Sequence, residues 1–233
     1  MSDLKWLFDP SPISGNEQGE SPFSAMLEEA AKKLGGTISM FVREVVSNSA
    51  DQKSKETSYP VNIFIDFIEI SGVTKKTFKK EMDWESLSKH IEAAAGDGES
   101  NPSQIELKAS LNKMENNDAS SLLVRVSDYN AYGLIGEETD KKSNFHLFCK
   151  SVFKTSTDNV RQGSFGLGKG VLYHQSGLNT VLTSSYCNHD GENKMRVFGR
   201  SEQQSHETEH GKEYRKTSGC AGAGFFGLPK ELD

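Results

Sequence analysis

The chain has 233 residues, a net charge of −6 at neutral pH and 26% charged residues. This length allows one large domain or two small ones, and we expect a single α/β domain. The acidic balance excludes a broad basic surface for nucleic acid, so a contact with DNA would have to come through other domains. The sequence contains no apolar run of membrane-spanning length and does not begin like a signal peptide. We therefore expect a cytosolic (cytoplasmic) protein without a membrane partner.

The cysteines and histidines predict no metal centre. The three cysteines are odd in number and widely spaced, which argues against a disulfide framework or a zinc site. His206 and His210 have a helix-compatible ligand spacing, but they stand in a strongly polar segment without a Glu-x-x-His pattern. We interpret that segment as a solvated loop.

The first half of the chain alternates between helical and strand patterns. Proline, serine and glycine dominate residues 9–22, which predicts an extended arm over 1–22 ahead of a domain over 23–233. Apolar spacing predicts helices over 23–34 and 38–46, divided by Gly35 and Gly36. A strand over 61–70, a helical stretch over 75–95, a loop over 96–102 and a strand over 105–111 are expected next.

The second half begins with a buried central strand, predicted over 121–126 and ending at Asp128. A short apolar helix over 145–153 and a strand over 178–183 follow. The polar segment 189–219 indicates a strand only around Val197 and Phe198. For residues 219–227 both a strand and a loop remain open.

A glycine-rich loop, Gly-Ser-Phe-Gly-Leu-Gly-Lys-Gly, occupies residues 163–170. Exposed backbone amides at the start of a helix form a site for phosphate. The spacing of Gly163, Gly168 and Lys169 fits a Walker A loop, but Gly170 stands where a hydroxyl must bind magnesium. The residues before the loop are polar and form no buried strand, and the glycine spacing does not fit a dinucleotide fingerprint either. Alone, the loop predicts a phosphate contact of undefined class.

Three polar residues share one stripe of the helix predicted from residue 38. At 100° per residue, Glu44, Asn48 and Asp51 fall within about one-sixth of the helix circumference. A carboxylate at the edge of a core can polarise a water molecule, and an amide oxygen can bind a hard cation. The alternative is a capped, solvated helix face, and the spacing alone favours this alternative.

Asp128 stands where a strand runs into a turn that contains Asn130 and Gly133, two residue types that tolerate positive φ. A carboxylate at this position can accept a hydrogen bond from the amino group of a ligand. An ordinary turn initiated by aspartate is the alternative.

In this order, the three segments resemble the GHKL ATPases, which include gyrase, a heat-shock chaperone, histidine kinases and MutL. The resemblance covers residues 38–185. It implies a Bergerat ATP-binding fold: an α/β (α+β) sandwich with a mixed, mostly antiparallel sheet covered by helices on one face. ATP would lie between helices and sheet beneath a lid loop.

The resemblance also implies roles for single residues. Glu44 resembles the general base that activates water, Asn48 the Mg²⁺ ligand and Asp51 the acid that follows it near the nucleotide. Asp128 resembles the carboxylate that receives the adenine amino group, and Gly133 the glycine that closes the turn.

Two positions depart from the family pattern. Asn130 stands at the first glycine position of the turn, and one extra residue precedes Gly133. The threonine that often helps to hold the base matches either Thr183 or Thr217.

The resemblance also implies a lid loop over the phosphates. This loop would comprise Gly163, Ser164, Phe165, Gly166, Leu167, Gly168 and Lys169, with Lys169 assigned from charge and position.

The function implied is magnesium-dependent ATP binding and slow ATP hydrolysis, acting as an ATP-gated conformational or dimerisation switch in a larger machine. Its partners would be a second copy, reached by the N-terminal arm, and a C-terminal effector domain or partner protein. The glycine loop most resembles the chaperone and MORC-like branches, which occur in DNA-related and antiviral defence systems. The alternatives are an ATP-binding module with little turnover and a histidine-kinase-type phosphotransfer domain, against which Glu44 argues.

Overall fold

The computed structural model describes residues 4–12, 29, 31–55, 57–96, 102–150, 167–189, 191–204, 206 and 218–228. The strands are β1 (Lys5–Pro12), β2 (Asn62–Ile70), β3 (Ser121–Tyr129), β4 (Thr180–His189), β5 (Glu192–Glu202) and β6 (Ser218–Gly227). The helices are α2 (Thr37–Asp51), α3 (Gly72–Glu81), α4 (Trp84–Ala95), α5 (Pro102–Glu115), the π-helix η1 (His146–Lys150) and α6 (Leu167–His174).

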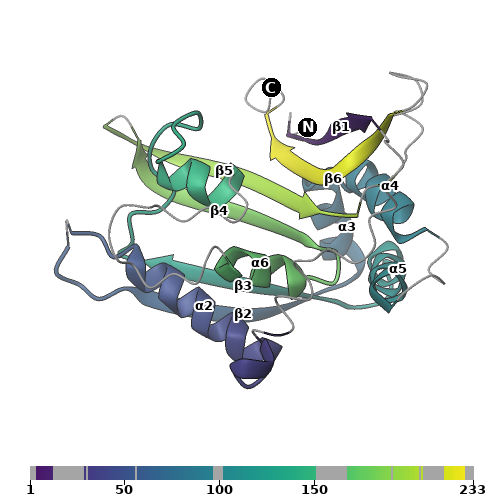
Figure 1. Ribbon diagram of the computed structural model, residues 1–233, viewed down its shortest axis with the longest axis horizontal. Coiled ribbons are helices and arrows are strands. Elements are labelled where there is room, and N and C mark those ends of the chain that lie inside the picture. The colour runs from purple at the N-terminus through teal and green to yellow at the C-terminus, as the bar shows by residue number, and fades with distance from the viewer. Residues whose placement is uncertain are drawn as a thin grey trace.

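The strands form a four-stranded sheet in the order β1-β6-β5-β4 and a separate pair of β2 and β3. Every strand pair in the described part of the chain is antiparallel. In Figure 1, α2 crosses in front of β2 and β3, while α3, α4 and α5 gather at one end of the molecule. The expected α+β class is confirmed, with antiparallel sheets and packed helices.

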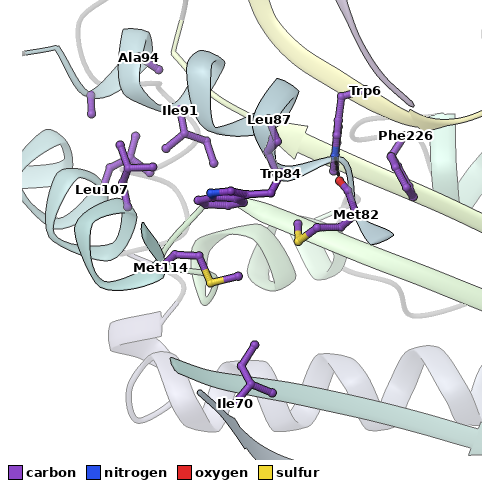
Figure 2. Packing of buried hydrophobic residues seen from close by; sticks show 12 residues of the cluster. Trp6, Ile70, Met82, Trp84, Leu87, Ile91, Ala94, Leu107, Met114 and Phe226 are labelled. Carbon is purple, nitrogen blue, oxygen red and sulfur yellow. Dashed lines mark hydrogen bonds between the residues drawn. The ribbon is translucent and has the colours of Figure 1, made fainter. Parts of the chain in front are cut away.

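Helices pack against both faces of the four-stranded sheet, whereas the sequence led us to expect cover on one face. Phe226 belongs to the main core with Trp84, Leu87 and Ile91 of α4, as Figure 2 shows. The preceding residue, Phe225, packs on the opposite side against a second cluster that includes Cys149 of η1. Successive strand residues point to opposite faces, so a single strand supports both layers.

The arm expected over residues 1–22 begins as a strand of this chain's own sheet. β1 pairs with β6, with Lys5 opposite Gly227 and Pro12 opposite Ser218. Trp6 is buried in the main core, where its indole Nε1–H donates to the Met82 carbonyl at 2.7 Å. The residues from 13 to 28 lie outside the described part of the chain. The described part of the arm therefore pairs with another strand of the same chain.

The strand expected over 105–111 is wrong, because these residues lie in helix α5. Leu107, Leu111 and Met114 are buried at steps of four and three residues, which is the spacing of one helix face. Pro102 is the first residue of α5, a position where its missing N–H costs no hydrogen bond. The helical stretch expected over 75–95 is in turn divided into α3 and α4 at Asp83, which has φ +49°.

β3 forms where it was predicted, but it is not the buried central strand that we expected. Among the described strands it pairs only with β2, and Leu122 and Val124 are 57% and 48% exposed. Its apolar composition suits a half-covered pair of strands equally well, because β-propensity reports packing on a pleated surface rather than depth.

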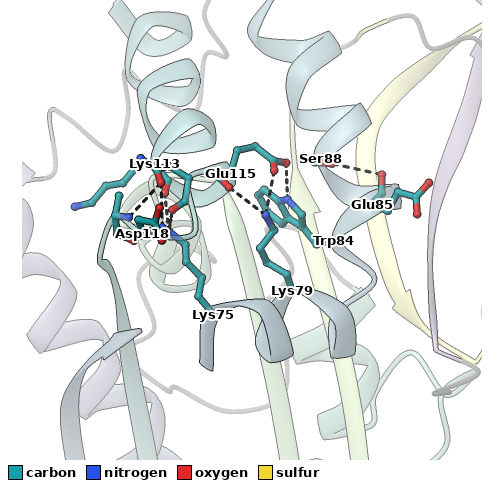
Figure 3. Close-up of polar contacts among 10 residues, drawn as sticks. Lys75, Lys79, Trp84, Glu85, Ser88, Lys113, Glu115 and Asp118 are labelled. Carbon is teal, nitrogen blue, oxygen red and sulfur yellow. Dashed lines mark hydrogen bonds and ion pairs between the residues drawn. The ribbon is translucent and has the colours of Figure 1, made fainter. Parts of the chain in front are cut away.

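The end of α5 is held by a buried lysine of α3. The Nζ atom of Lys75 donates to the carbonyls of Lys113, Asn116 and Ala119 at 2.6, 2.8 and 2.8 Å. Figure 3 shows Lys75 extending from α3 towards the end of α5. Carbonyls at a helix C-terminus lack helical partners and attract a cation. Burial, followed by the charges of Lys79 and Lys113, lowers the pKa of Lys75. This buried lysine therefore has a structural role.

The interpretation of His206 as part of a solvated loop is wrong. Its ring is buried, and Nε2 lies 2.8 Å from Nδ1 of His90, whose ring stacks on Phe8. Burial lowers the pKa of His206, so the neutral ring is favoured. Its Nδ1–H donates to the Gln204 carbonyl at 2.7 Å. The cluster joins β1, α4 and the chain after β5.

Candidate functional site

The C-terminal end of α2 is joined to the turn that follows β3. Lys53 forms an antiparallel bridge with Ala131. The Ser54 N–H donates to the Asn130 carbonyl at 3.0 Å, and the Tyr132 N–H donates to the Gln52 carbonyl at 2.9 Å. We call residues 130–136 the base-side turn, after the adenine contact that the resemblance implies for this region. Two segments that the sequence singled out separately, about 80 residues apart, thus form one hydrogen-bonded unit.

The three polar residues of α2 differ in their exposure. Glu44 is buried, with 9% of its surface exposed, Asn48 is half-buried, and Asp51 is exposed at the last position of the helix. Asn48 lies one helical turn before Gln52, and Glu44 about 12 Å before it along the axis. The stripe therefore runs from a buried carboxylate towards the base-side turn, and Glu44 is not part of a fully solvated helix face.

Asp128 is the penultimate residue of β3, where it pairs with Ile63 and exposes its carboxyl group. Asn130 follows with φ +66°, and its side-chain amide donates to the Pro60 carbonyl at 2.8 Å. Asn130 thereby ties the turn to the chain that enters β2. The sequence predicts Asn130 as a ligand-binding residue, and in the structure its amide nitrogen donates within the protein itself.

Gly133 passes close to β4. A Cβ atom built on Gly133 would lie 2.5 Å from the Ser185 Oγ and 3.2 Å from the Cys187 Cβ, and its φ is +70°. The Leu134 N–H donates to the same Ser185 Oγ at 3.0 Å. Only glycine combines the required conformation with the required space. The glycine predicted to close the turn is therefore fixed by contact with a strand that the sequence did not connect to it.

Replacing Gly133 by alanine should destabilise the fold more than the same change at Gly191. Both residues have positive φ, but a Cβ at Gly191 would meet nothing within 4 Å. In the matched control Gly191→Ala, the free energy of unfolding should therefore fall only by the cost of positive φ for a residue with a Cβ atom, about 1 kcal/mol. Gly133→Ala adds steric overlap worth about 1–3 kcal/mol. Urea denaturation of both variants measures the difference, and equal losses would contradict the close approach.

The glycine-rich loop is described only at its C-terminal end. Gly163, Ser164, Phe165 and Gly166 lie outside the described residues, and Leu167, Gly168 and Lys169 form the first turn of α6. α6 lies beside α2 in Figure 1, and Val171 shares a buried cluster with Ala31 and Met40. Helix α2 therefore contacts both the base-side turn and the helix that follows the glycine loop.

Further along α6, Tyr173 is a half-buried side chain. Burial raises the pKa of Tyr173, and Arg200 and Glu202 of β5 act on it electrostatically. Arg200 donates to the carbonyls of Cys149 and Lys150 at 3.1 Å each. The tyrosine hydroxyl therefore stays protonated at neutral pH.

The Mg²⁺ ion that the resemblance implies would need oxygen ligands from this region. Within the described ranges, no three histidine, cysteine, aspartate or glutamate side chains gather to hold a metal. Magnesium bound to nucleotide phosphates needs only one or two protein oxygens. Asn48 supplies an amide oxygen one turn from the Glu44 carboxylate, so these residues fit a phosphate-bound Mg²⁺ and not an all-protein cage.

Several residues of this region had no recognisable sequence signal. The Asn144 side chain donates to the Gln52 Oε1 at 2.9 Å and to the Gly133 carbonyl at 3.2 Å, linking α2 to the turn. Ser185 and Arg196 contact the turn from β4 and β5. Their sequence surroundings are polar and without a motif. Of the two threonine candidates, Thr183 pairs with Phe198 in the four-stranded sheet, and Thr217 lies outside the described residues.

Comparisons of the chain with family models, with curated proteins and with solved structures find no match. Among the helices described, none is both long and apolar enough to cross a membrane.

Proposed function

We propose that this chain is a Bergerat-type ATP-binding domain that hydrolyses ATP slowly in the presence of magnesium. The observation that carries the proposal is the junction between α2 and the base-side turn, because it joins the helix of Glu44 and Asn48 to the strand end at Asp128. A nucleotide site of this kind needs its base contact and its hydrolytic group at fixed separation. The contact of α6 with α2 adds the end of the glycine loop to the same region.

Asp128 would recognise the base. Its exposed carboxylate at the end of β3 accepts a hydrogen bond from the exocyclic amino group of adenine. Gly133, whose backbone lies close to Ser185 and Cys187 of β4, would keep the turn beside the base in place. Guanine carries an oxygen in place of that amino group and would be repelled by the carboxylate. The proposal therefore includes a preference for ATP over GTP.

Glu44 would act as the general base. Its carboxylate accepts a proton from a water molecule whose oxygen forms a bond to the γ-phosphorus. The bond between the γ-phosphorus and the β,γ-bridging oxygen breaks, and ADP leaves with the electron pair of that bond. Burial keeps Glu44 in one position relative to the rest of α2. When bound, magnesium supplies positive charge that offsets the charge on the phosphate oxygens, with Asn48 as its protein ligand.

The same contacts support a switching role. α2 touches the base-side turn at one end and α6 along its first half, so a change at the phosphates can reach the base contact through one helix. We propose that this movement is passed to a second copy or to an effector domain. Residues 5–12 are already paired within the chain, so an exchange between copies would have to involve other segments.

Isothermal calorimetry with ATP, GTP and magnesium tests the proposed function. We expect binding of ATP that strengthens with Mg²⁺, and binding of GTP that is about tenfold weaker or more, because a hydrogen bond to a charged group contributes roughly 1.5–3 kcal/mol. Hydrolysis is followed by phosphate release in the same samples. If no nucleotide binds, the proposed function is wrong. A preference for GTP would contradict the proposed role of Asp128 in binding the adenine amino group.

A further inference from the structure

Two side chains that face each other on neighbouring strands of the four-stranded sheet form hydrogen bonds with the base-side turn. Ser185 of β4 stands directly opposite Arg196 of β5. The Ser185 Oγ accepts the N–H of Leu134 at 3.0 Å, and the Arg196 Nη1 donates to the carbonyl of the same residue at 2.7 Å. Both backbone polar groups of Leu134 are thus satisfied by one pair of side chains. Cross-strand neighbours hold a fixed separation, so this pair fixes the turn relative to the sheet.

The guanidinium of Arg196 is itself held in place from several sides. Its Nη1 donates a second hydrogen bond, to the Gly136 carbonyl at 2.7 Å. Its Nη2 lies 3.5 Å from the Glu138 carboxylate, and the side chain is only 10% exposed. The guanidinium carbon lies 3.9 Å from the centroid of the Phe145 ring. Such a planar, multiply bonded arginine is preorganised, and a lysine could not reproduce this set of contacts.

The turn needs this anchor because of its own sequence. Gly133 and Gly136 both have positive φ, at +70° and +86°, and glycine has the widest conformational freedom of any residue. The N-terminal side of the turn is fixed by β3 and by the hydrogen bond of Asn130 to Pro60. Arg196 fixes the C-terminal side. Without it, residues 134–136 of the turn would lose two hydrogen bonds to their carbonyls and would have to be ordered on each binding event, at the expense of affinity.

We propose that Arg196 is a positioning residue that sets the base selectivity of this site. The inference rests on the ATP-binding function proposed above. Arg196 contacts the turn and not the nucleotide, so it acts by holding the Gly133 backbone at the distance from Asp128 that adenine requires. Its loss reduces the discrimination between bases and leaves the step at Glu44, on the other side of the junction, unchanged at saturation.

The test compares Arg196→Met and Arg196→Lys with the control Arg125→Met. Arg125 is an exposed arginine of β3 that pairs with Asp66 at 2.9 Å on the strand face opposite Asp128. Calorimetry measures the affinities for ATP and for inosine triphosphate, which lacks the amino group. We expect the ratio of the two affinities to fall about three- to tenfold in Arg196→Met, less in Arg196→Lys, and not in the control. Turnover by Arg196→Met at saturating ATP should stay within about twofold of the wild-type value.

A second readout separates positioning from a general loss of stability. Hydrogen exchange at the amides of residues 133–136 should accelerate in Arg196→Met without nucleotide, while the amides of α4 and α5 keep their protection. If Arg196→Met fails to fold, Arg196→Lys carries the test through the same affinity ratio. An unchanged ratio in a folded Arg196 variant overturns this inference alone. A wild-type chain that binds no nucleotide overturns the proposed function and this inference with it.

Discussion

Replacing Glu44 by glutamine is expected to lower ATP turnover by about 10²–10⁴-fold, which is the usual contribution of a positioned general base. Glutamine has nearly the same shape but cannot accept the proton from water. Glu44 is buried on α2, and the turn beside the proposed base contact adjoins the far end of that helix. The affinity for ATP should therefore change less than about threefold. Phosphate release and calorimetry on the same preparation measure the two quantities.

Glu81→Gln is the matched control, because Glu81 is an exposed glutamate at the end of another helix, α3. It should hydrolyse ATP like the wild type. Equal turnover in Glu44→Gln and the wild type would show that another group activates water. A wild-type chain that binds ATP without releasing phosphate would identify a binding module. Acid-labile phosphate on the protein or a partner would favour the phosphotransfer alternative.

Replacing Asp128 by asparagine should weaken ATP binding by about 10–100-fold. The substitution removes a charged acceptor and presents an amide of uncertain orientation to the adenine amino group, and a hydrogen bond to a charged group contributes roughly 1.5–3 kcal/mol. Binding of inosine triphosphate should not weaken and should even strengthen, since its base carries the same oxygen as guanine, which the carboxylate repels and an amide N–H can bind. The two affinities therefore converge in the variant, which calorimetry detects directly.

Asp66→Asn controls for the loss of a strand carboxylate. Asp66 lies on the neighbouring strand β2 and pairs with Arg125 on the face opposite Asp128. Its substitution should leave both affinities within about twofold, because exposed ion pairs contribute at most about 1 kcal/mol. A tenfold loss in this control would mean that the pair β2 and β3 responds as a whole, and Asp128 would lose its specific role.

Local patterns were sufficient for the elements that carry the candidate site. The β-branched run of β2 predicted this strand nearly to both ends. The starts of α2 and β3 were also predicted, whereas α2 continues past residue 46 to Asp51 and β3 past residue 126 to Tyr129. The positions of Asp128 at a strand end and of Gly133 in a turn followed from the same patterns. These features depend on neighbours within a few residues, which a single sequence displays.

The errors occurred where local patterns agree with more than one structure. The apolar residues of α5 are compatible with a short strand until the full helix face of Leu107, Leu111 and Met114 is seen. Residues 9–22 are rich in proline and glycine, but Trp6 just before them is fixed by Met82 and Phe226. Exposure of Leu122 and Val124 depends on what packs beside β3, and its composition does not contain that information.

By itself, the sequence determined the order of helices and strands around the three motifs, and the residue types from which a nucleotide site can be built. Only the tertiary structure decided which of these residues belong together. The Ser54 N–H donates to Asn130 and the Tyr132 N–H donates to Gln52, which joins segments about 80 positions apart. Arg196 likewise reaches Leu134 across 62 positions. Such contacts form when elements pack and their backbone polar groups must find partners, a condition that no local pattern of residues expresses.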